Sequence, residues 1–388
     1  MRALINTAPL YGKGAGARTY TAGLLTALAA SAVDMEWDVL VREADYQRLG
    51  LAADPRFHRL AIGWPPAPPT LRGARFLWRN AVDQVIIPYS GRKYDVIHYL
   101  DSYGPLWGAG RTPFALTVHD VFPITHPEYF KPWVARYLAA LMRVIPRASA
   151  LMAISEQTAR DLTERFGIAL ERIRVIHNGV DARFHPATAD ERRAALRKYG
   201  VNSPYFLAVG TVEARKNLSR IIRAFEQARS GGAITQQLLI AGKAGYGYDE
   251  IVNATREPDL NNAARLLGYV PDEDVVALMS GADALIYISL AEGFGLPVIE
   301  GMACGAPVIT SHTGALAEVA GNAAYLVDPE KQAGIAAALM TLGHSAEWRA
   351  RLRLASLERA KAFSWGAVAE ATVTAYREAV ARGVMRPS

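Results

Sequence analysis

Short apolar segments alternate with stretches of helical pattern along the whole chain. In the first half, the segments with the length and composition of buried strands are Ala3–Ile5, Asp38–Val41, Asp95–Leu100, Phe114–Val118, Ala150–Ile154 and Arg174–His177. Strands of this kind that alternate with helices are typical of βαβ units, in which neighbouring strands run parallel. The pattern therefore predicts a doubly wound α/β domain.

A second series of the same kind begins after the polar, helix-like stretch Asp190–Lys198. Its strand-like segments are Tyr205–Val209, Leu238–Ala241, Arg265–Leu267, Ala284–Ile288, Pro307–Thr310 and Ala324–Val327. Because a chain of 388 residues exceeds what one hydrophobic core usually organises, we expect two Rossmann-like domains, residues 1–185 and 200–365. A C-terminal helix, residues 366–388, follows and can return to the first domain.

Open parallel sheets bind ligands at the carboxyl ends of their strands. Two such sheets in one chain can face each other across a cleft, so we expect an active site that draws on both domains. The segment Phe184-His185-Pro186 interrupts the pattern, and Asn202-Ser203-Pro204 precedes the next strand. These breaks place the domain boundary near residues 181–203.

The composition is that of a globular protein, with 51% apolar and 21% charged residues. The single cysteine, Cys304, excludes an internal disulfide, and no Cys/His group has the spacing of zinc ligands. Residues 1–10 lack the apolar core of a signal peptide, and no apolar run approaches the roughly 20 residues that span a bilayer. We expect a cytoplasmic protein that does not cross a membrane.

The net charge of +6 is unevenly distributed. Residues 1–200 carry 26 Lys and Arg against 18 Asp and Glu, whereas residues 201–388 carry 17 against 19. A basic first half attracts phosphates, whether these belong to nucleic acid, anionic lipid or a phosphorylated substrate. No nucleic-acid-binding motif accompanies the charge, so we do not expect a nucleic-acid partner.

The most informative segment is Ser289–Ala306 (SLAEGFGLPVIEGMACGA). Glu292 and Glu300 flank the start of an apolar helix, and a glycine-rich turn lies between them. Glycines let backbone N–H groups approach a ligand, and a helix start supplies further free donors. In an arbitrary sequence, two glutamates at this spacing are more often one acidic residue of a loop and one on the face of a helix, without a common ligand. Here the pattern indicates a site for an oxygen-rich ligand.

The spacing E-G-F-G-L-P-x-x-E-x-x-A-x-G-x-P-V in this segment resembles the signature of the retaining family 4 glycosyltransferases, which have the GT-B fold. Other segments match the same family in the same order along nearly the whole chain. The resemblance implies transfer of a sugar from a nucleotide-sugar donor without a cofactor or a metal. It implies that Glu300 binds the ribose and Glu292 the donor sugar. The amides that would complete the sugar pocket belong to Gly293, Phe294, Gly295 and Leu296.

Two further segments resemble the parts of the family that surround the donor diphosphate. Val209–Asn217 (VGTVEARKN) implicates Arg215 and Lys216, and two fixed cations can neutralise a diphosphate without Mg²⁺. Tyr11–Tyr20 (YGKGAGARTY) implicates the amides of Gly14 and Gly16. This loop lacks the third glycine of the dinucleotide fingerprint and the acidic residue expected further on, which argues against a dehydrogenase.

The remaining site residues that the resemblance implies follow other strands. In Thr117–Pro123 (TVHDVFP), His119 is expected beside the donor sugar and Asp120 on the acceptor side, although a histidine at a strand end is more often structural. Lys243, Tyr269 and Val270 are expected to line the nucleotide pocket. Ser155 is expected to be a helix N-cap.

The sequence T-V-H-D-x-x-P followed by His126-Pro127-Glu128 resembles mannosyl- and rhamnosyltransferases of bacterial polysaccharide or lipopolysaccharide assembly. It favours a GDP-linked donor. The family resemblance as a whole implies retention through same-face attack, and we expect a saccharide or lipid-linked saccharide as acceptor. Transferases that use UDP- or ADP-linked sugars share most of these motifs, so such donors stay open. A sugar phosphorylase, a nucleotide-sugar epimerase and a non-catalytic subunit that binds nucleotide-sugar or glycan are competing hypotheses.

The region Tyr129–Arg147 interleaves aromatic and aliphatic residues with basic ones. Such a pattern suits a helix on the surface of an anionic membrane, which would place the protein at the inner face of the cytoplasmic membrane. A helix that packs on the core with its apolar face and exposes its basic face explains the same residues, and it is the more frequent source of such a pattern.

Overall fold

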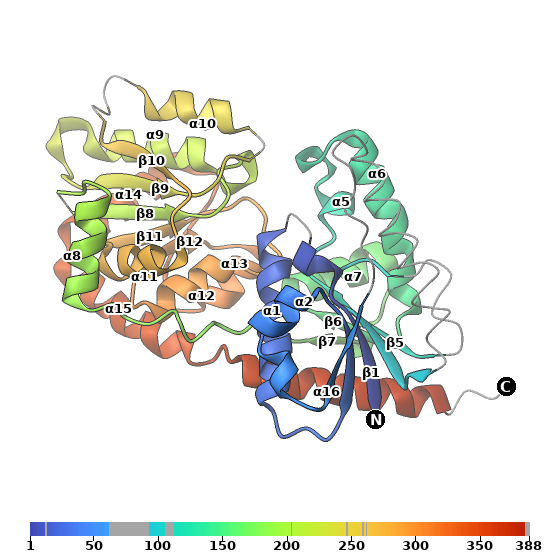
Figure 1. Ribbon diagram of the computed structural model, residues 1–388. Helices are drawn as coiled ribbons and strands as arrows, with labels where there is room; N and C mark the ends of the chain where they lie inside the picture. Colours follow the sequence, from blue (N-terminus) through green and yellow to red (C-terminus); the bar gives the residue numbers. More distant parts are fainter. Residues whose placement is uncertain are drawn as a thin grey trace, which may run out of the picture. The chain divides into compact units, whose positions relative to one another are not determined.

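The computed structural model describes residues 1–384 apart from 12–13, 62–92, 105–111, 203, 246, 258–259 and 261. The chain forms two compact units (Figure 1). Unit 1 contains Met1–Gly179 and Ser364–Ser388, and unit 2 contains Val180–Phe363. Each unit is built around one parallel sheet that is flanked by helices, which confirms the doubly wound α/β architecture predicted from the sequence.

In the described part of unit 1, the strands of the sheet are all parallel and follow the order β3-β2-β1-β4-β5-β6-β7. They are β1 (Arg2–Asn6), β2 (Glu36–Leu40), β3 (Phe57–Leu60), β4 (Val96–Tyr99), β5 (Phe114–Val118), β6 (Ala150–Ala153) and β7 (Ile173–Val175). Side chains alternate between the two faces of the sheet. Ala3 and Ile5 belong to the core cluster on one face, and Leu4 belongs to the cluster on the other.

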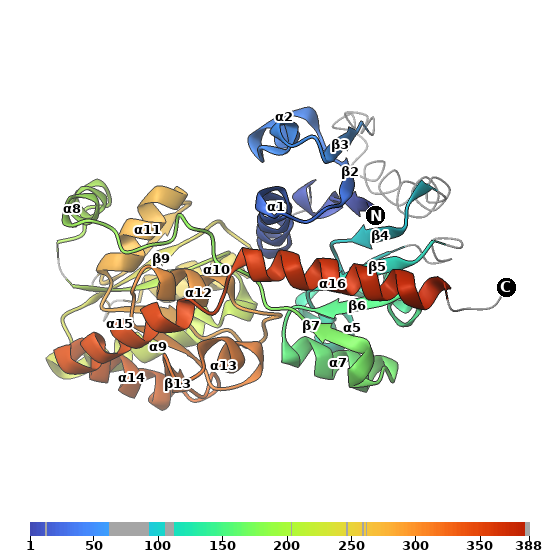
Figure 2. The ribbon, with the colours of Figure 1, turned by 90° about the horizontal axis from the view of Figure 1, so that it is seen from below.

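In the part of unit 1 that the structure describes, helices cover both faces of this sheet. They are α1 (Ala15–Ala30), α2 (Glu43–Arg48), α5 (Phe122–Thr125), α6 (Pro132–Leu141), α7 (Glu156–Phe166) and α16 (Trp365–Val384), with 3-10 turns η1 (Ala8–Tyr11), η2 (Leu51–Ala53), η5 (Pro127–Tyr129), η6 (Met142–Arg147) and η7 (Leu170–Arg172). The last helix, α16, packs on α1 and on β4, β5 and β6, as Figure 2 shows. Its Val368, Val373 and Tyr376 are buried there. The C-terminal helix therefore forms part of the core of unit 1.

In the described part of unit 2, the parallel strands follow the order β10-β9-β8-β11-β12-β13. They are β8 (Tyr205–Val209), β9 (Gln237–Ala241), β10 (Ala264–Gly268), β11 (Ala284–Tyr287), β12 (Val308–Ser311) and β13 (Tyr325–Val327). The helices are α8 (Ala189–Lys198), α9 (Leu218–Arg229), α10 (Tyr248–Thr255), α11 (Asp272–Gly281), α12 (Leu296–Ala303), α13 (Gly314–Ala320), α14 (Gln332–His344) and α15 (Ala346–Ala360), with 3-10 turns η8 (Ala214–Lys216) and η9 (Ser230–Gly232). One core cluster joins Phe225 of α9 and Leu339 of α14 to Phe206 of β8.

The structure differs from the sequence-based expectations in two elements. Strand β3 was not expected, because only Phe57 of its first three residues is buried while His58 and Arg59 are exposed at the sheet edge. The single helix expected over Tyr129–Arg147 is also wrong, because the chain there is divided into η5, α6 and η6. Pro146 cannot continue a regular α-helix.

The chain passes from unit 1 to unit 2 between Gly179 and Val180, a few residues before the boundary expected near residues 181–203. The reason lies in local packing. The amide of Ala187 donates to Oγ of Ser280 at 2.9 Å, and α8 packs on α11. The segment that interrupts the strand pattern therefore belongs to unit 2.

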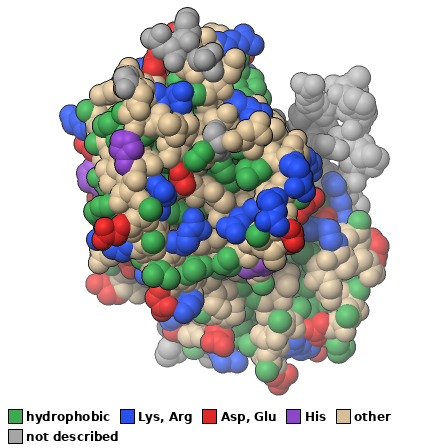
Figure 3. All heavy atoms as spheres, turned by 90° about the vertical axis from the view of Figure 1, so that its left-hand side faces the viewer, with side chains coloured by type: hydrophobic (Ala, Val, Ile, Leu, Met, Phe, Trp, Pro, Cys, Tyr) green, Lys and Arg blue, Asp and Glu red, His purple; other side chains and the backbone are tan. Residues whose placement is uncertain are grey.

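On the face drawn in Figure 3, basic, acidic and apolar side chains are intermixed. Within the described residues, none of the helices combines the length and the apolar character that crossing a membrane requires.

Candidate active site

The loops after β8 and β9 approach each other closely at the carboxyl edge of the unit 2 sheet, which requires a glycine, and backbone hydrogen bonds hold them together. A Cβ atom added at Gly242 would lie 1.7 Å from the carbonyl oxygen of Gly210, so only glycine fits there. The amide of Gly210 donates to Ala241 at 3.0 Å, and that of Val212 donates to Lys243 at 2.9 Å. The two loops are thus fixed against each other before the basic pair begins.

Arg215 and Lys216 lie in η8, directly before α9. Asn217 connects the two elements with a φ of 60°, in the left-handed region that asparagine tolerates better than most residues. Its Nδ2 donates to the carbonyl oxygen of Pro329 at 2.7 Å, and its Oδ1 accepts from Arg220 at 2.8 Å. This anchored turn fixes where the basic pair leaves the backbone.

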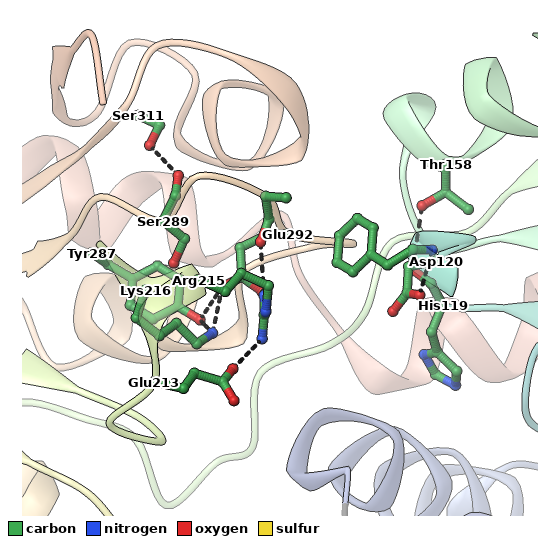
Figure 4. Close-up of polar contacts among 12 residues, drawn as sticks. His119, Asp120, Thr158, Glu213, Arg215, Lys216, Tyr287, Ser289, Glu292 and Ser311 are labelled. Atoms are coloured by element: carbon green, nitrogen blue, oxygen red, sulfur yellow. Dashed lines mark hydrogen bonds and ion pairs between the residues drawn. The ribbon is translucent and has the colours of Figure 1, made fainter. Parts of the chain in front are cut away.

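The carboxylate of Glu292 binds both basic side chains (Figure 4). Nη1 of Arg215 lies 3.0 Å from Oε2 of Glu292, and Nζ of Lys216 donates to Oε1 of the same carboxylate. Arg215 also donates to the carbonyl oxygen of Ala291 at 2.7 Å and to Oε1 of Glu213 at 2.8 Å. Only 12% of the Lys216 side chain and 10% of the Glu292 side chain are exposed. The two cations therefore share the carboxylate of Glu292, and Arg215, whose side chain is 20% exposed, also pairs with Glu213.

Burial and charge act in opposite directions on this cluster. Burial alone would raise the pKa of Glu292, but the charges of Lys216 and Arg215 outweigh it and lower the pKa to about 2. Burial lowers the pKa of Lys216, although Glu292 favours its charged form. Glu292 also raises the pKa of Arg215 against the effect of burial. At neutral pH Glu292 is a carboxylate, which can accept hydrogen bonds but cannot donate a proton.

Tyr287, at the end of β11, completes the cluster and was missed in the sequence. Its hydroxyl accepts a hydrogen bond from Lys216 at 2.5 Å and donates one to Oε1 of Glu292 at 2.9 Å. Nζ of Lys216 also lies 4.7 Å from the ring centroid. In the sequence, Tyr287 has the pattern of one more apolar strand residue, and the only signal was its place at a strand end directly before the glutamate loop.

Glu300 lies in α12, whereas Glu292 lies in the loop before that helix. The turn between them includes Gly295, whose φ is 110° and whose added Cβ would lie 2.5 Å from Cδ2 of Leu316. Burial raises the pKa of Glu300 to about 7, with Arg183 opposing the shift. The two carboxyl groups of the motif therefore differ in charge near neutral pH, since only Glu292 is fully ionised.

The other residues of the motif line the same turn. Phe294 is 3% exposed, and its ring lies 5.9 Å from that of Phe363 at 79°. Leu296 begins α12 and is buried, while Gly293 is partly exposed. Phe294 therefore anchors the turn in unit 2.

In unit 1, His119 and Asp120 follow β5 directly. Nε2 of His119 donates to the carbonyl oxygen of Leu100 at 3.0 Å, and its backbone amide donates to Oγ of Ser102 at 3.1 Å. Oδ1 of Asp120 accepts from the amide of Phe122 at 3.1 Å. Asp120 thus shapes the start of α5, while the Nε2 contact with Leu100 orients the imidazole of His119.

The remaining candidate residues lie at the carboxyl edges of the two sheets. Gly14 is the N-cap of α1 and Gly16 lies in its first turn, both exposed. In unit 2, Nζ of Lys243 lies 4.4 Å from the ring centroid of Tyr269, which is 61% exposed. Val270 is buried. Ser155 is a helix N-cap that accepts from the amide of Thr158, as predicted from the sequence.

Comparison of the sequence with protein families assigns both halves of the chain. The family Glycosyltransferase Family 4 matches residues 14–184, and the family Glycosyl transferases group 1 matches residues 191–359. The O-antigen chain mannosyltransferase B of Escherichia coli is 30% identical over 67% of this chain and 69% of its own length. A glycogen synthase of Mycobacterium tuberculosis is 31% identical over 71% of this chain, but the match spans slightly less than two thirds of that enzyme, 65%.

Comparison with solved structures extends over nearly the whole chain. The sucrose-phosphate synthase of Thermosynechococcus elongatus has a TM-score of 0.75 and 20% identity, covering 98% of this chain and 99% of its own. HepE of Anabaena, in complex with UDP and glucose, has a TM-score of 0.72 and 18% identity, covering 96% and 98%. At these identities the likeness concerns the fold. Together with the mannosyltransferase match and the two family assignments, it shows that the chain belongs to glycosyltransferase family 4 and has the GT-B fold.

Proposed function

We propose that the chain transfers a hexose, with mannose or rhamnose favoured, from a GDP-linked donor to a saccharide or lipid-linked saccharide. The transfer would retain the anomeric configuration and need no metal ion. The observation that carries the proposal is the pair of nearly buried cations, Arg215 and Lys216, at the carboxyl edge of the unit 2 sheet. The relatives named as mannosyltransferases, from Escherichia coli and from Mycolicibacterium hassiacum, support the choice of sugar.

In this proposal, Arg215 and Lys216 bind the donor diphosphate. Charge-assisted hydrogen bonds from fixed cations stabilise the negative charge that develops on the leaving nucleoside diphosphate. The carboxylate that the two cations share in the structure, Glu292, is then free to accept hydrogen bonds from hydroxyls of the donor sugar. Since Glu292 stays ionised at neutral pH, it acts as an acceptor of hydrogen bonds, and the departing phosphate takes the proton of the acceptor.

The other candidate residues would surround the donor. Glu300 accepts hydrogen bonds from the ribose hydroxyls, and the amides of residues 293–296 face the sugar. Residues 243, 269 and 270 line the nucleotide pocket. From unit 1, His119 lies beside the donor sugar and Asp120 on the acceptor side, and the amides of residues 14 and 16 face the diphosphate.

The donor is tested by thermal unfolding in the presence of GDP, UDP, ADP and their sugar conjugates. A ligand at one hundred times its dissociation constant stabilises the folded state by about 2.7 kcal/mol. We expect the largest shift with GDP and GDP-mannose, and loss of that shift in Arg215→Ala. The matched control is Arg223→Ala, because Arg223 is an exposed residue of the neighbouring helix α9. A selective shift with UDP would instead assign a UDP-linked donor.

Retention and metal independence need an assay of transfer. With GDP-mannose and a mannoside acceptor, we expect product formation to persist in EDTA, and the new linkage to have the α configuration of the donor by proton NMR. An inverted product, or activity that requires added Mg²⁺ or Mn²⁺, would contradict this part of the proposal.

Contact with an anionic membrane at the inner face of the cytoplasmic membrane is a further part of the proposal. In and beside α6, Trp133 is 61% exposed, and Lys131, Arg136 and Arg143 are exposed as well. Aromatic and basic side chains together favour the interface of anionic bilayers. We expect co-sedimentation with phosphatidylglycerol vesicles at low salt that Trp133→Ala weakens. Trp348→Ala is the control, since Trp348 is a 37% exposed tryptophan of unit 2.

A further inference from the structure

Trp365, the first residue of α16, lies in a slot between two glycines. A Cβ atom added at Gly23 of α1 would lie 2.3 Å from Cε2 of Trp365. One added at Gly179 would lie 2.6 Å from its Cγ. No other residue leaves space for the indole at either position. The place of this ring is thus determined by two segments of unit 1 that are far from Trp365 and from each other in the sequence.

The indole of Trp365 contacts Tyr20, and Tyr20 contacts His119. The ring centroids of Trp365 and Tyr20 are 5.9 Å apart at 60°, and those of Tyr20 and His119 are 5.0 Å apart at 83°. Tyr20 is 1% exposed, so its ring has little freedom to move. An aromatic chain therefore connects the start of the C-terminal helix to the imidazole that follows β5.

A buried polar network holds the middle of this chain. The hydroxyl of Tyr20 shares a hydrogen bond of 3.1 Å with Oγ1 of Thr117, two residues before His119. Oγ1 of Thr117 lies 2.8 Å from Nε2 of His98, and Nδ1 of His98 lies 2.5 Å from the hydroxyl of Tyr376 in α16. The C-terminal helix thus reaches the strand that carries His119 at two positions, Trp365 and Tyr376.

The polar contacts of His119 leave its ring orientation dependent on Tyr20. Its backbone is held by Ser102 and Thr158, and one ring nitrogen, Nε2, donates to the carbonyl oxygen of Leu100. One hydrogen bond at a ring nitrogen still permits the imidazole to tilt about that contact. The perpendicular ring of Tyr20 restricts this tilt.

We propose that Trp365 is a positioning residue for the transfer reaction. By fixing Tyr20, it fixes the plane of the His119 imidazole and keeps the hydrogen atom on Nε2, so that Nδ1 remains the acceptor. This inference rests on the proposed place of His119 beside the donor sugar. It assigns to the first turn of α16 the positioning of His119, in addition to packing in the core of unit 1.

The direct test measures the ¹⁵N chemical shifts of Nδ1 and Nε2 of His119 by long-range ¹H–¹⁵N NMR on the full-length protein. The variant His119→Asn, which lacks these signals, assigns them. In the wild-type protein we expect the pattern of a neutral ring protonated at Nε2. In Trp365→Leu we expect averaging toward a mixture of the two tautomers. Trp365→Phe, which keeps an aromatic ring in the slot, should restore most of the wild-type pattern.

The kinetic test separates positioning from binding. We expect Trp365→Leu to lower kcat by between about tenfold and a hundredfold, the range that a small misplacement of a reacting group can cause, with little change in the KM for the donor. Tyr20→Leu should behave in the same way, and Tyr20→Phe should retain most of the kcat because the ring remains.

The control for a general loss of stability is Ile168→Ala. Ile168 follows α7, is 2% exposed and belongs to a different core cluster of unit 1 from Tyr20 and Tyr376. This variant should lower the melting temperature without changing the His119 signals. Unchanged His119 signals in Trp365→Leu would overturn the inference whatever the activity. A different result is full activity of His119→Asn together with changed His119 signals in Trp365→Leu. The proposed role of His119 in transfer would then fail, but the contact from Trp365 through Tyr20 to His119 would stand.

Discussion

At the scale of single residues, the positions of Arg215 and Lys216 on the donor side of the site depend on the carboxylate of Glu292, with which both pair. Burying charged groups is costly unless they are paired, and here Glu292 pairs with both Arg215 and Lys216. Arg215 and Lys216 can therefore exchange one anionic partner, Glu292, for another. A diphosphate carries the oxygens and the charge that would take the place of this carboxylate.

Tyr287→Phe tests how far the position of Lys216 depends on the tyrosine hydroxyl. The variant keeps the ring and removes two hydrogen bonds, one from Lys216 and one to Glu292. Because the hydroxyl holds Nζ of Lys216 in place before the donor binds, we expect the affinity for the donor nucleotide to fall by about tenfold, which corresponds to about 1.4 kcal/mol. Isothermal titration calorimetry with the nucleotide measures this. Tyr248→Phe, in α10, is the control, and equal affinities of wild type and Tyr287→Phe would refute the assignment.

Glu300 gives the binding of the donor a dependence on pH. Burial raises its pKa to about 7, so the carboxyl group is protonated below neutral pH in the free protein. Only the ionised form accepts hydrogen bonds from both ribose hydroxyls. We therefore expect the nucleotide affinity to rise between about pH 6 and pH 8, where a group with this pKa ionises. Titrations at several pH values check this, and Glu300→Gln should bind more weakly with a flatter profile over that range.

At the scale of the elements, the loops after β8 and β9 determine whether the basic pair is presented correctly. Gly242→Ala would place a methyl group 1.7 Å from the carbonyl oxygen of Gly210 and force the two loops apart. We expect a loss of roughly 1–3 kcal/mol of stability, as for other overpacked sites, and a large loss of nucleotide binding. Denaturant unfolding and calorimetry measure the two effects.

The matched control for Gly242→Ala is Gly334→Ala in α14. At Gly334 the nearest atom to an added Cβ is 3.9 Å away, and the backbone is helical. Alanine is favoured over glycine in a helix by about 1 kcal/mol, so this variant should be slightly stabilised and bind nucleotide normally. Normal nucleotide binding by Gly242→Ala would show that the loop contact does not matter for the site.

The sequence predicts most of the elements because both sheets are buried parallel sheets, whose strands are short apolar runs. Strand β3 lacks this pattern, since at the sheet edge only Phe57 needs to be apolar. The helix expected over residues 129–147 was wrong because aromatic and basic residues can alternate without a continuous helix. In the site, Glu292 and Arg215 are visible through their motifs. Tyr287 and Trp365 are not, because their roles depend on contacts between segments distant in the sequence.

At the scale of the whole molecule, each unit has its own core and its own buried titratable groups. In unit 1, burial lowers the pKa of His98 to about 3 from an ordinary value of 6.5. In unit 2, the pKa of Glu292 is lowered to about 2, and that of Glu300 is raised to about 7. The two units should therefore respond differently to mild acid.

Between pH 6.5 and 4.5, we expect unit 1 to lose stability while unit 2 does not. The unfolded chain protonates His98 below its ordinary pKa, whereas the folded unit keeps it neutral, so the free energy of unfolding falls as the pH falls, by up to about 1.4 kcal/mol per pH unit. In unit 2, Glu300 binds its proton more readily when folded, and Glu292 costs stability only below its ordinary pKa of 4.5. Native-state hydrogen exchange across this range measures each unit separately. Protection that declines equally in both units would contradict the expectation, whereas an earlier decline for amides of β1, β4 and β5 would place the acid sensitivity at the network that joins His98 to α16.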